Sequence, residues 1–524
     1  MTIMNSTPIL NPSLLLSERK QSRRRCLVTL LTMSGLGLAG CSSAPARVDL
    51  DGNASALQER LREQIESEEM ITAPVSLYEA MARALKYNLD QKIELAEIAM
   101  RIKQGEARSA DMLPTLVAGM GGTYRSNESG SRSKSLLTGR QSLEPSTSSE
   151  QANTSADLML SWDVLDYGLA RARQRQQADE QIISVERRRK VINRILEDVR
   201  TAYWRAVSAD RTSKKLASLE VMTKRALRQS EELEQRRIAS PSILLGFQRD
   251  LLQVSGEVQR LQRELAMSKT QLAALMNLAP DTSYQLYLPD RSDFVPGLPG
   301  SADAMVMTGL RYRPEVRESL YRQRIVRGEI DIAYLRAMPS VRSVLGLNHD
   351  SNDFLYNQHW LNISSRVSWN LLEAFRYPKV KAAIEAESAA LQQRDLALAM
   401  AIMTQIYVAR SRFLRLSEEL GIASRAQMVQ LRLVTQAQGA FKARAISQQQ
   451  LVREEMNYIL AEIRYDVAYS DAQNAYANLY ASMGLDNFEV DTNSDISVAA
   501  LAASLQEYWT ERTFSLPSRD VPKS

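Results

Sequence analysis

The sequence predicts a mixed α/β membrane protein in which paired β-strands are joined to long helical hairpins, and in which this unit occurs twice. Three observations support this fold class. The chain of 524 residues repeats a set of sequence markers at fixed offsets. Each copy has segments in which apolar and polar residues alternate, as in a strand with one apolar face. Each copy also has a helix-forming stretch too long for a globular core, followed by a segment with heptad periodicity.

The offsets between equivalent residues locate the repeat and one insertion. Pro114 and Pro339 are separated by 339 − 114 = 225 residues, whereas Trp162 and Trp369 are separated by 369 − 162 = 207. The difference of 225 − 207 = 18 residues falls in a serine-rich stretch of the first copy, 126–155. Loops tolerate insertions that packed elements do not, so we expect this stretch to be an exposed loop. Further equivalent positions are Leu85 and Leu310, Ser240 and Ser447, and Met276 and Met483.

Four segments have the period of two that is typical of β-strands. In residues 155–164 the even-numbered positions are apolar and the odd-numbered positions are mostly polar. Residues 361–371 alternate similarly, except that Ser365 lies on the apolar face. Such alternation, with a tryptophan near one end, is the pattern of a membrane-spanning strand with one lipid face and one water face. A soluble, half-buried hairpin would give a similar pattern. The predicted strand pairs are 115–125 with 155–165, and 340–349 with 361–371.

One long helix is predicted after the first strand pair. Residues 166–168, Asp-Tyr-Gly, are a candidate helix breaker, and residues 169–240 contain neither proline nor glycine. At 1.5 Å per residue, about 70 residues of helix would extend for about 100 Å. No globular core is so wide, so the helix needs partners along its length.

The partners of the long helices are predicted from heptad periodicity. From Leu244 to Leu275 apolar residues recur at steps of three and four, and the second copy keeps this phase from Leu451 to Leu479. We expect each of these helices to fold back from a turn, near Ser240 in the first copy and near Ser447 in the second, and to cover half of its long helix. The segments expected to cover the other halves are 76–109 and 302–337.

The N-terminal segment has the three parts of an export signal. Basic residues between positions 19 and 25 precede an apolar run, 26–38, which is too short to span a membrane permanently. The run ends in Leu-Ala-Gly followed by Cys41. This resembles a bacterial lipoprotein signal, in which Cys41 is lipidated and becomes the mature N-terminus, and in which Ser42 fits an outer-membrane destination. The alternative is an ordinary signal peptide with an incidental cysteine.

Charge and composition argue against several function classes. The chain has a formal net charge of +5, but residues 1–40 contribute +4, so the mature chain has 5 − 4 = +1 and no basic excess for nucleic-acid binding. Cys26 lies in the signal and Cys41 is used by lipid, which leaves no disulfide or cysteine metal site. The only histidines, His349 and His359, lie in or beside a strand loop. We therefore expect no enzyme, no cofactor and no metal.

Four strands cannot close a membrane barrel, because the smallest such barrels have about eight. Open strand edges are not tolerated in lipid, where each unpaired backbone group costs several kcal/mol. If the strands span a membrane, the barrel must therefore be shared between several chains.

Taken together, these features resemble the TolC family of outer-membrane efflux and secretion channels, over about residues 76–486. The residues that carry the resemblance are 77–80 (Leu-Tyr-Glu-Ala), 84–88 (Ala-Leu-Lys-Tyr-Asn), 162–168 (Trp-Asp-Val-Leu-Asp-Tyr-Gly) and 239–241 (Ala-Ser-Pro). The family implies a homotrimer whose twelve strands close one transmembrane β-barrel, continued by a periplasmic coiled-coil barrel of helices. It also implies a periplasmic adaptor protein and an inner-membrane pump as partners, contact with outer-membrane lipid, and no catalysis.

The sequence departs from the family pattern at the tips of the hairpins. Arg237 and Arg444 stand three residues before the turn serines, where family members usually have glycine. Gln450 and Arg453 stand where some members have two carboxylates that attract cations. These four residues are the candidates for a periplasmic entrance or gate, and three copies of Arg453 around one axis would disfavour cations. The alternative is that they are solvated turn charges without a gating role.

The sequence leaves two alternative functions open. Type I secretion of a protein is an alternative to small-molecule efflux, and a structural coiled-coil lipoprotein is an alternative to any channel. The sequence does not identify the exported substrate. The predicted parts are a signal peptide (1–40), a lipidated linker (41–75), repeat 1 (76–280), an inter-repeat linker (281–301), repeat 2 (302–490), and a tail (491–524) with a short helix over 496–513.

Overall fold

The computed structural model describes residues 49–236, 240–279, 282–291, 296–485 and 496–512. The predicted signal peptide, the lipidation site Cys41 and the entrance candidate Arg237 lie outside these residues. Within them, no helix is both long enough and apolar enough to cross a membrane.

The chain divides into two units, residues 1–68 and residues 69–524. The described part of the first unit contains one helix, α2 (Leu50–Glu66), in the segment where we expected only a linker. It begins after Asp49, whose side chain accepts a hydrogen bond from the amide of Gly52 at 3.1 Å. This is the usual way in which an aspartate caps the free amides of a helix N-terminus.

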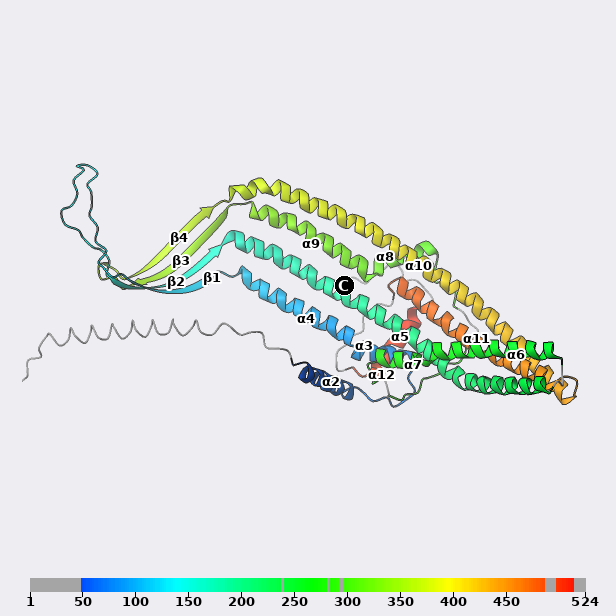
Figure 1. Ribbon diagram of the computed structural model, residues 1–524. Coiled ribbons are helices and arrows are strands. Elements are labelled where there is room, and N and C mark those ends of the chain that lie inside the picture. The colour runs from blue at the N-terminus through cyan, green and yellow to red at the C-terminus, as the bar shows by residue number, and fades with distance from the viewer. Residues whose placement is uncertain (1–48, 237–239, 280–281, 292–295, 486–495, 513–524) are drawn as a thin grey trace, which may run out of the picture. The chain divides into compact units, whose positions relative to one another are not determined.

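In the second unit the two repeats have similar element orders. Repeat 1 consists of α3 (Leu77–Tyr87), α4 (Leu89–Ser109), η1 (Ala110–Met112), β1 (Thr115–Tyr124), β2 (Ala152–Asp163), α5 (Val164–Gln235), α6 (Pro241–Ala266) and α7 (Ser268–Leu275). Repeat 2 consists of α8 (Ala302–Tyr312), α9 (Pro314–Arg336), β3 (Ser340–Asp350), β4 (His359–Ser368), α10 (Leu371–Lys442) and α11 (Gln448–Ser482), and α12 (Val498–Arg512) follows. Repeat 1 thus also has η1, and its helices α6 and α7 correspond to the single helix α11 of repeat 2. Figure 1 shows α4, α5, α9 and α10 side by side, with the strands extending from one end of this row.

The long helices α5 and α10 each have 72 residues. The candidate breaker at 166–168 does not interrupt α5, which starts at Val164 directly after β2. Asp163 caps this start, because its side chain accepts a hydrogen bond from the amide of Leu165 at 2.9 Å. Gly168 stays helical and faces α9, where an added Cβ would lie 3.8 Å from the methyl carbons of Leu335. Packing on a neighbouring helix thus outweighs the low helix propensity of one glycine, which is about 1 kcal/mol.

The shorter partner helices are divided where the sequence predicted continuous ones. The segment 76–109 is interrupted at Asn88, whose side chain accepts a hydrogen bond from the amide of Asp90 and caps α4. The segment 302–337 is interrupted at Arg313, because the residue before a proline is disfavoured in the helical region. A third break, at Met267, separates α6 from α7, although the heptad pattern continues through it.

The four strands form one antiparallel sheet in the order β1-β2-β3-β4. The pair β2 and β3 joins the two repeats, and the outer edges of β1 and β4 have no partner strand among the described residues. The predicted bounds change most at β2 and β4. Strand β2 begins at Ala152 rather than 155, and β4 spans His359–Ser368 rather than 361–371 because α10 begins at Leu371.

The register places the alternating residues of all four strands on two distinct faces. Leu160 of β2 pairs with Leu116 of β1 and Leu345 of β3, and Leu345 pairs with Ile363 of β4. Because side chains alternate along a strand, these residues share one face. We call it the apolar face; it comprises Leu116, Ala118, Met120, Gly122, Tyr124, Ala156, Leu158, Leu160, Trp162, Val341, Ser343, Leu345, Leu347, His349, His359, Leu361, Ile363, Ser365 and Val367.

The ends of α7 and α11 form an equivalent corner in each repeat. Asn277 and Gly484 are related by the repeat offset, 484 − 277 = 207, and have positive φ angles of 62° and 72°. Each follows a helix C-terminus and turns the chain, as in a Schellman motif. The corner at Gly484 contacts the break at Arg313, and an added Cβ would lie 2.9 Å from the Arg313 amide nitrogen. At the other corner, the side chain of Asn88 donates to the carbonyl of Leu275 at 3.4 Å.

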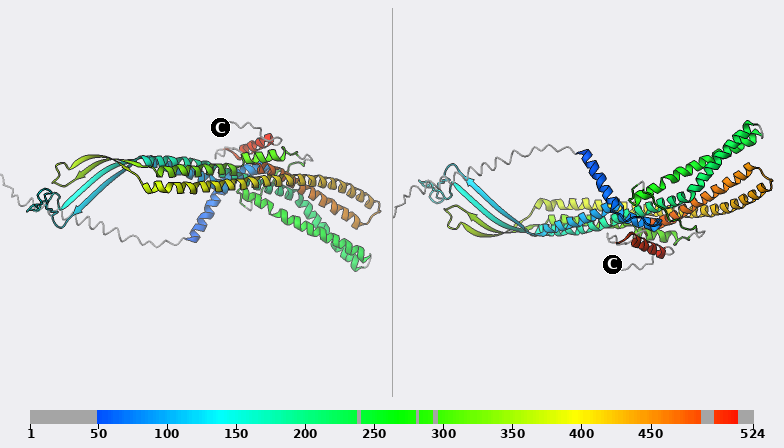
Figure 2. Two further views of the ribbon diagram at one scale, coloured as in Figure 1. Left: turned by 90° about the horizontal axis from the view of Figure 1, so that it is seen from above. Right: turned by 90° about the horizontal axis from the view of Figure 1, so that it is seen from below.

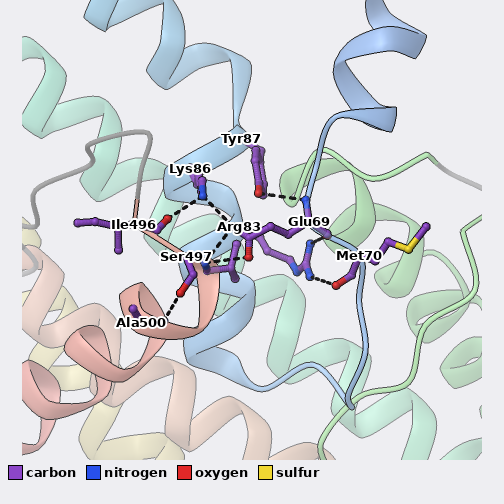
Figure 3. Close-up of polar contacts among 9 residues, drawn as sticks. Glu69, Met70, Arg83, Lys86, Tyr87, Ile496, Ser497 and Ala500 are labelled. Carbon is purple, nitrogen blue, oxygen red and sulfur yellow. Dashed lines mark hydrogen bonds and ion pairs between the residues drawn. The ribbon is translucent and has the colours of Figure 1, made fainter.

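The C-terminal helix α12 lies within the predicted 496–513 and is held on α3 by Glu69 (Figure 3). The Lys86 Nζ donates to Glu69 Oε1 at 2.7 Å, and the amide of Val498 in the first turn of α12 donates to the same carboxylate at 3.1 Å. The hydrogen bond from Lys86 is the largest cause of a Glu69 pKa below its ordinary value.

Candidate functional site

The two helical hairpins end in turns that start with a serine. Ser447 precedes α11, and its Oγ accepts a hydrogen bond from the amide of Gln450 at 3.2 Å. Ser240 directly precedes α6, and its carbonyl accepts from the amide of Leu244 at 3.2 Å. Gln450 thus lies in the first turn of α11 with its side chain exposed. Figure 2 shows the α5–α6 and α10–α11 hairpins as two separate arms at this end of the molecule.

Arg444 has a backbone conformation that explains why glycine would suit its position. Its φ is +57°, in the left-handed region that favours glycine. It is the second residue after the end of α10 and forms a Schellman motif, with hydrogen bonds from the Arg444 amide to the Phe441 carbonyl and from the Ala445 amide to the Ala440 carbonyl. The equivalent residue, Arg237, lies outside the described residues.

Arg453 connects the two hairpins. Its Nη2 lies 3.1 Å from Asp250 Oδ2 on α6, and its guanidinium lies 5.5 Å from the ring centroid of Phe247, also on α6. Both charged side chains are about half-exposed. Sequence reasoning selected Arg453 but not its two partners, because the contact spans 203 residues and no local pattern indicates it.

Beneath this contact the hairpins share an apolar core. Phe247 and Leu251 of α6 belong to one cluster of buried residues with Leu219 of α5 and with Met456 and Leu460 of α11. A pocket of about 490 Å³ beside the cluster is lined by residues of α6, α10 and α11. The polar and charged side chains in its lining are Asp250, Gln253, Glu257, Gln430, Arg453, Asn457 and Arg464.

At the other end of the molecule the apolar face of the sheet is open to solvent in the single chain. Aromatic side chains gather where the strands meet the helices. Trp162 packs edge-on against Tyr167, with ring centroids 6.1 Å apart. The Trp369 indole donates to the Ala337 carbonyl at 2.9 Å, and Tyr334 contacts Tyr377. Amphipathic aromatic rings of this kind are enriched at membrane–water interfaces.

The opposite face of the sheet is mostly polar and carries two adjacent arginines. Arg342 of β3 pairs directly with Arg366 of β4 in the register. Only Arg342 has an acidic neighbour among the described residues, with its Nε 3.4 Å from Asp163 Oδ2. Like charges placed directly opposite each other on neighbouring strands repel. The pairing of Arg342 with Arg366 therefore does not help to hold the two strands together.

The loop ends of the strands contain the two histidines and the serine-rich insertion. His349 and His359 stack with ring centroids 4.4 Å apart. In the described parts of the chain, no group of three or more His, Cys, Asp or Glu residues is arranged to hold a metal ion. The insertion continues outward from β1 and β2 as a hairpin with isolated bridges. Gly139 lies at its turn with φ +68°, and the neighbouring Leu136 and Leu137 side chains are fully exposed.

Comparison with solved structures identifies the fold. No protein-family profile and no curated protein sequence matches this chain. The structure is similar to the CmeC outer-membrane channel of Campylobacter jejuni, with a TM-score of 0.60 and 16% identity over 82% of this chain and 89% of that one. It is also similar to the open state of the MtrE outer-membrane channel of Neisseria gonorrhoeae (0.57, 18%, 78% and 89%) and to the outer-membrane protein VceC of Vibrio cholerae (0.57, 14%, 78% and 96%). The resemblance drawn from the sequence is thus confirmed at the level of the fold.

Proposed function

We propose that this chain is the outer-membrane channel component of a tripartite efflux or secretion system of the TolC family. It conducts substrate passively and is not an enzyme. The observation that carries this proposal is the four-stranded sheet at the end of the helical row. It has an exposed apolar face, and its two edges have no partner strand within the described residues.

The unpaired edges favour a homotrimer. In lipid each unpaired backbone group costs several kcal/mol, so β1 and β4 need partner strands. Pairing β4 of one chain with β1 of the next gives twelve strands after three chains, which is enough to close a barrel. The apolar face would then contact outer-membrane lipid, and the polar face with Arg342 and Arg366 would line the interior.

In this assembly the hairpin tips form the periplasmic entrance. Arg444, Gln450 and Arg453 lie at or near the α10–α11 turn, together with Asp250 of α6. These tips are the surface at which a periplasmic adaptor would join the channel to an inner-membrane pump. Lipidation at Cys41 would add a second attachment to the membrane, and an intact mass equal to that of an unmodified mature chain would contradict it.

Planar-bilayer recording tests the proposal. The purified full-length protein should insert and give stable unitary currents, and crosslinking should trap a species of three chains. A scaffold lipoprotein built from coiled coils would give no current. Absence of unitary current from correctly folded protein would therefore reject the channel function.

A further inference from the structure

A basic groove lies between α5 and α9, close to the sheet. It has a volume of about 840 Å³ and is lined by Arg171 and Arg175 from α5 and by Arg324 and Arg327 from α9. Asp179 and Asp331 are its acidic residues, so the formal charge of the lining is 4 − 2 = +2. We call this site the α5/α9 groove.

In the described part of the chain, one of the four arginines is neutralised by an ion pair. Arg324 binds Asp179 through two nitrogens, and its Nε donates to Asp179 Oδ2 at 2.8 Å. Arg327 donates to the neutral Gln323 at 3.3 Å. Within the described residues, no carboxylate forms an ion pair with Arg171, Arg175 or Arg327. The groove thus presents three exposed guanidinium groups at its surface.

The end of the groove that lies nearest the sheet is apolar. Gly168, four residues after the start of α5, and Leu335, one residue before the end of α9, line this end. The charged end lies near Asp179, which is 179 − 168 = 11 residues farther along α5, or about 16 Å at 1.5 Å per residue. The polarity therefore changes along the groove from apolar at the sheet to basic farther away.

One face of α5 connects the arginines of the groove with the apolar face of the sheet. Tyr167, Arg171 and Arg175 are spaced by four residues and so lie on one face of α5. Tyr167 packs on Trp162, which belongs to the apolar face. Arg171 and Arg175 thus lie about one and about two helical turns from Tyr167, an aromatic residue of the kind that marks a membrane–water interface.

We propose that the α5/α9 groove binds the phosphate-bearing headgroup of an anionic phospholipid in the leaflet that faces the periplasm. This inference rests on the proposed function, because it requires the sheet to span the outer membrane. Guanidinium groups match phosphate oxygens in a two-pronged geometry. Arg171, Arg175 and Arg327 would hold the phosphate, and Leu335 would contact the start of an acyl chain.

Lipid titration with a matched control tests the groove. Delipidated full-length protein in detergent would be titrated with phosphatidylglycerol or phosphatidylethanolamine, and bound lipid would be counted by native mass spectrometry. The groove variant is Arg171→Gln with Arg175→Gln. The control, Arg173→Gln with Arg322→Gln, removes the same number of positive charges from two exposed arginines outside the groove lining, one on α5 and one on α9. Thermal unfolding should show that both variants fold as the wild type does.

We expect phosphatidylglycerol to bind the wild type and the control alike, and to bind the groove variant about tenfold or more weakly, because charge-assisted hydrogen bonds to phosphate are lost. Equal weakening in both variants would mean that general surface charge binds the lipid, and would overturn the proposal. Displacement of the lipid by millimolar inorganic phosphate would also overturn it, in favour of a free-anion site. Wild-type protein that binds lipid in detergent but gives no channels would count against the proposed function instead.

Discussion

We expect Arg453→Ala to increase the time that the channel spends in its conducting state. Arg453 of the α10–α11 hairpin makes two contacts with α6. It forms an ion pair with Asp250 at 3.1 Å, and its guanidinium lies 5.5 Å from the centroid of the Phe247 ring. An entrance that widens by separating the two hairpins must break this contact. The variant removes a contact that only joined hairpins can make, so it should shift the equilibrium towards separated hairpins.

The size of the shift follows from the exposure of the contact. Because both charged groups are about half-exposed, the ion pair contributes about 0.5 kcal/mol after screening. The contact of Arg453 with the Phe247 ring contributes about 0.5 kcal/mol more. Three chains that open together would lose about 3 kcal/mol, which is a factor of about 100 in the ratio of open to closed channels. Asp250→Asn removes only the ion pair, so we expect a factor of about 10 from it.

Open probability in planar bilayers measures this effect, with Arg260→Ala as the matched control. Arg260 also lies on α6 and is half-exposed, but it pairs with Glu257 and Glu264 of its own helix. The Arg260→Ala substitution should therefore leave gating unchanged. If Arg453→Ala and Arg260→Ala have the same open probability, the reasoning is refuted.

A charge exchange separates gating from ion selectivity. Asp250→Arg combined with Arg453→Asp keeps an ion pair but moves the positive charge from α11 to α6. Gating should return towards wild type, because opposite charges again face each other. If Arg453 also sets the ion preference, the reversal potential in a salt gradient should move towards cations, most clearly at low salt. An unchanged reversal potential would mean that Arg453 has no role in selectivity.

Three further outcomes are expected. Gly484→Ala should destabilise the fold by about 2–5 kcal/mol, because the residue has a positive φ and the added Cβ would lie 2.9 Å from the Arg313 backbone. Gly421→Ala, on an open helix surface, should stabilise the fold by up to about 1 kcal/mol. The order of the two unfolding midpoints checks this. Glu69→Gln should lower the unfolding midpoint at pH 7, and its difference from the wild type should shrink as the pH falls. The folded pKa of Glu69 is below its unfolded value, so the stabilisation is present above the unfolded pKa and is lost as the pH falls through the folded pKa. An epitope inserted at Gly139 should bind antibody on intact cells with export preserved, and labelling only after rupture of the outer membrane would reverse the topology.

The entrance candidates divide into residues that local sequence explains and residues that it does not. Ser240 and Ser447 were selected from the repeat offset and from the start of each heptad segment, and both precede the second helix of a hairpin. The unusual choice of Arg444 was visible in the sequence, but its left-handed backbone was not. Asp250 and Phe247 could not have been selected, because a charged or aromatic residue on a heptad helix has many roles and its partner lies in the other repeat.

Two aspects of the fold were determined by the sequence alone. The tandem repeat follows from offsets between identical residues, which need no structure. The sidedness of the strands follows from alternation, because side chains on neighbouring positions must point to opposite faces. Ser365, for example, was expected on the apolar face, and the register of β3 with β4 places it opposite Ser343 there.

Only the tertiary structure decided where the helices break and which elements meet. Helix continuation through Gly168 and interruption at Met267 both contradict the local pattern. Propensity differences of about 1 kcal/mol are small enough for packing against α9 to reverse them at Gly168. The pairing of β2 with β3, the contact of Arg453 with Asp250, and the basic groove between α5 and α9 all join residues from different repeats. Local periodicity records which face of an element is apolar, but not which distant element will cover it.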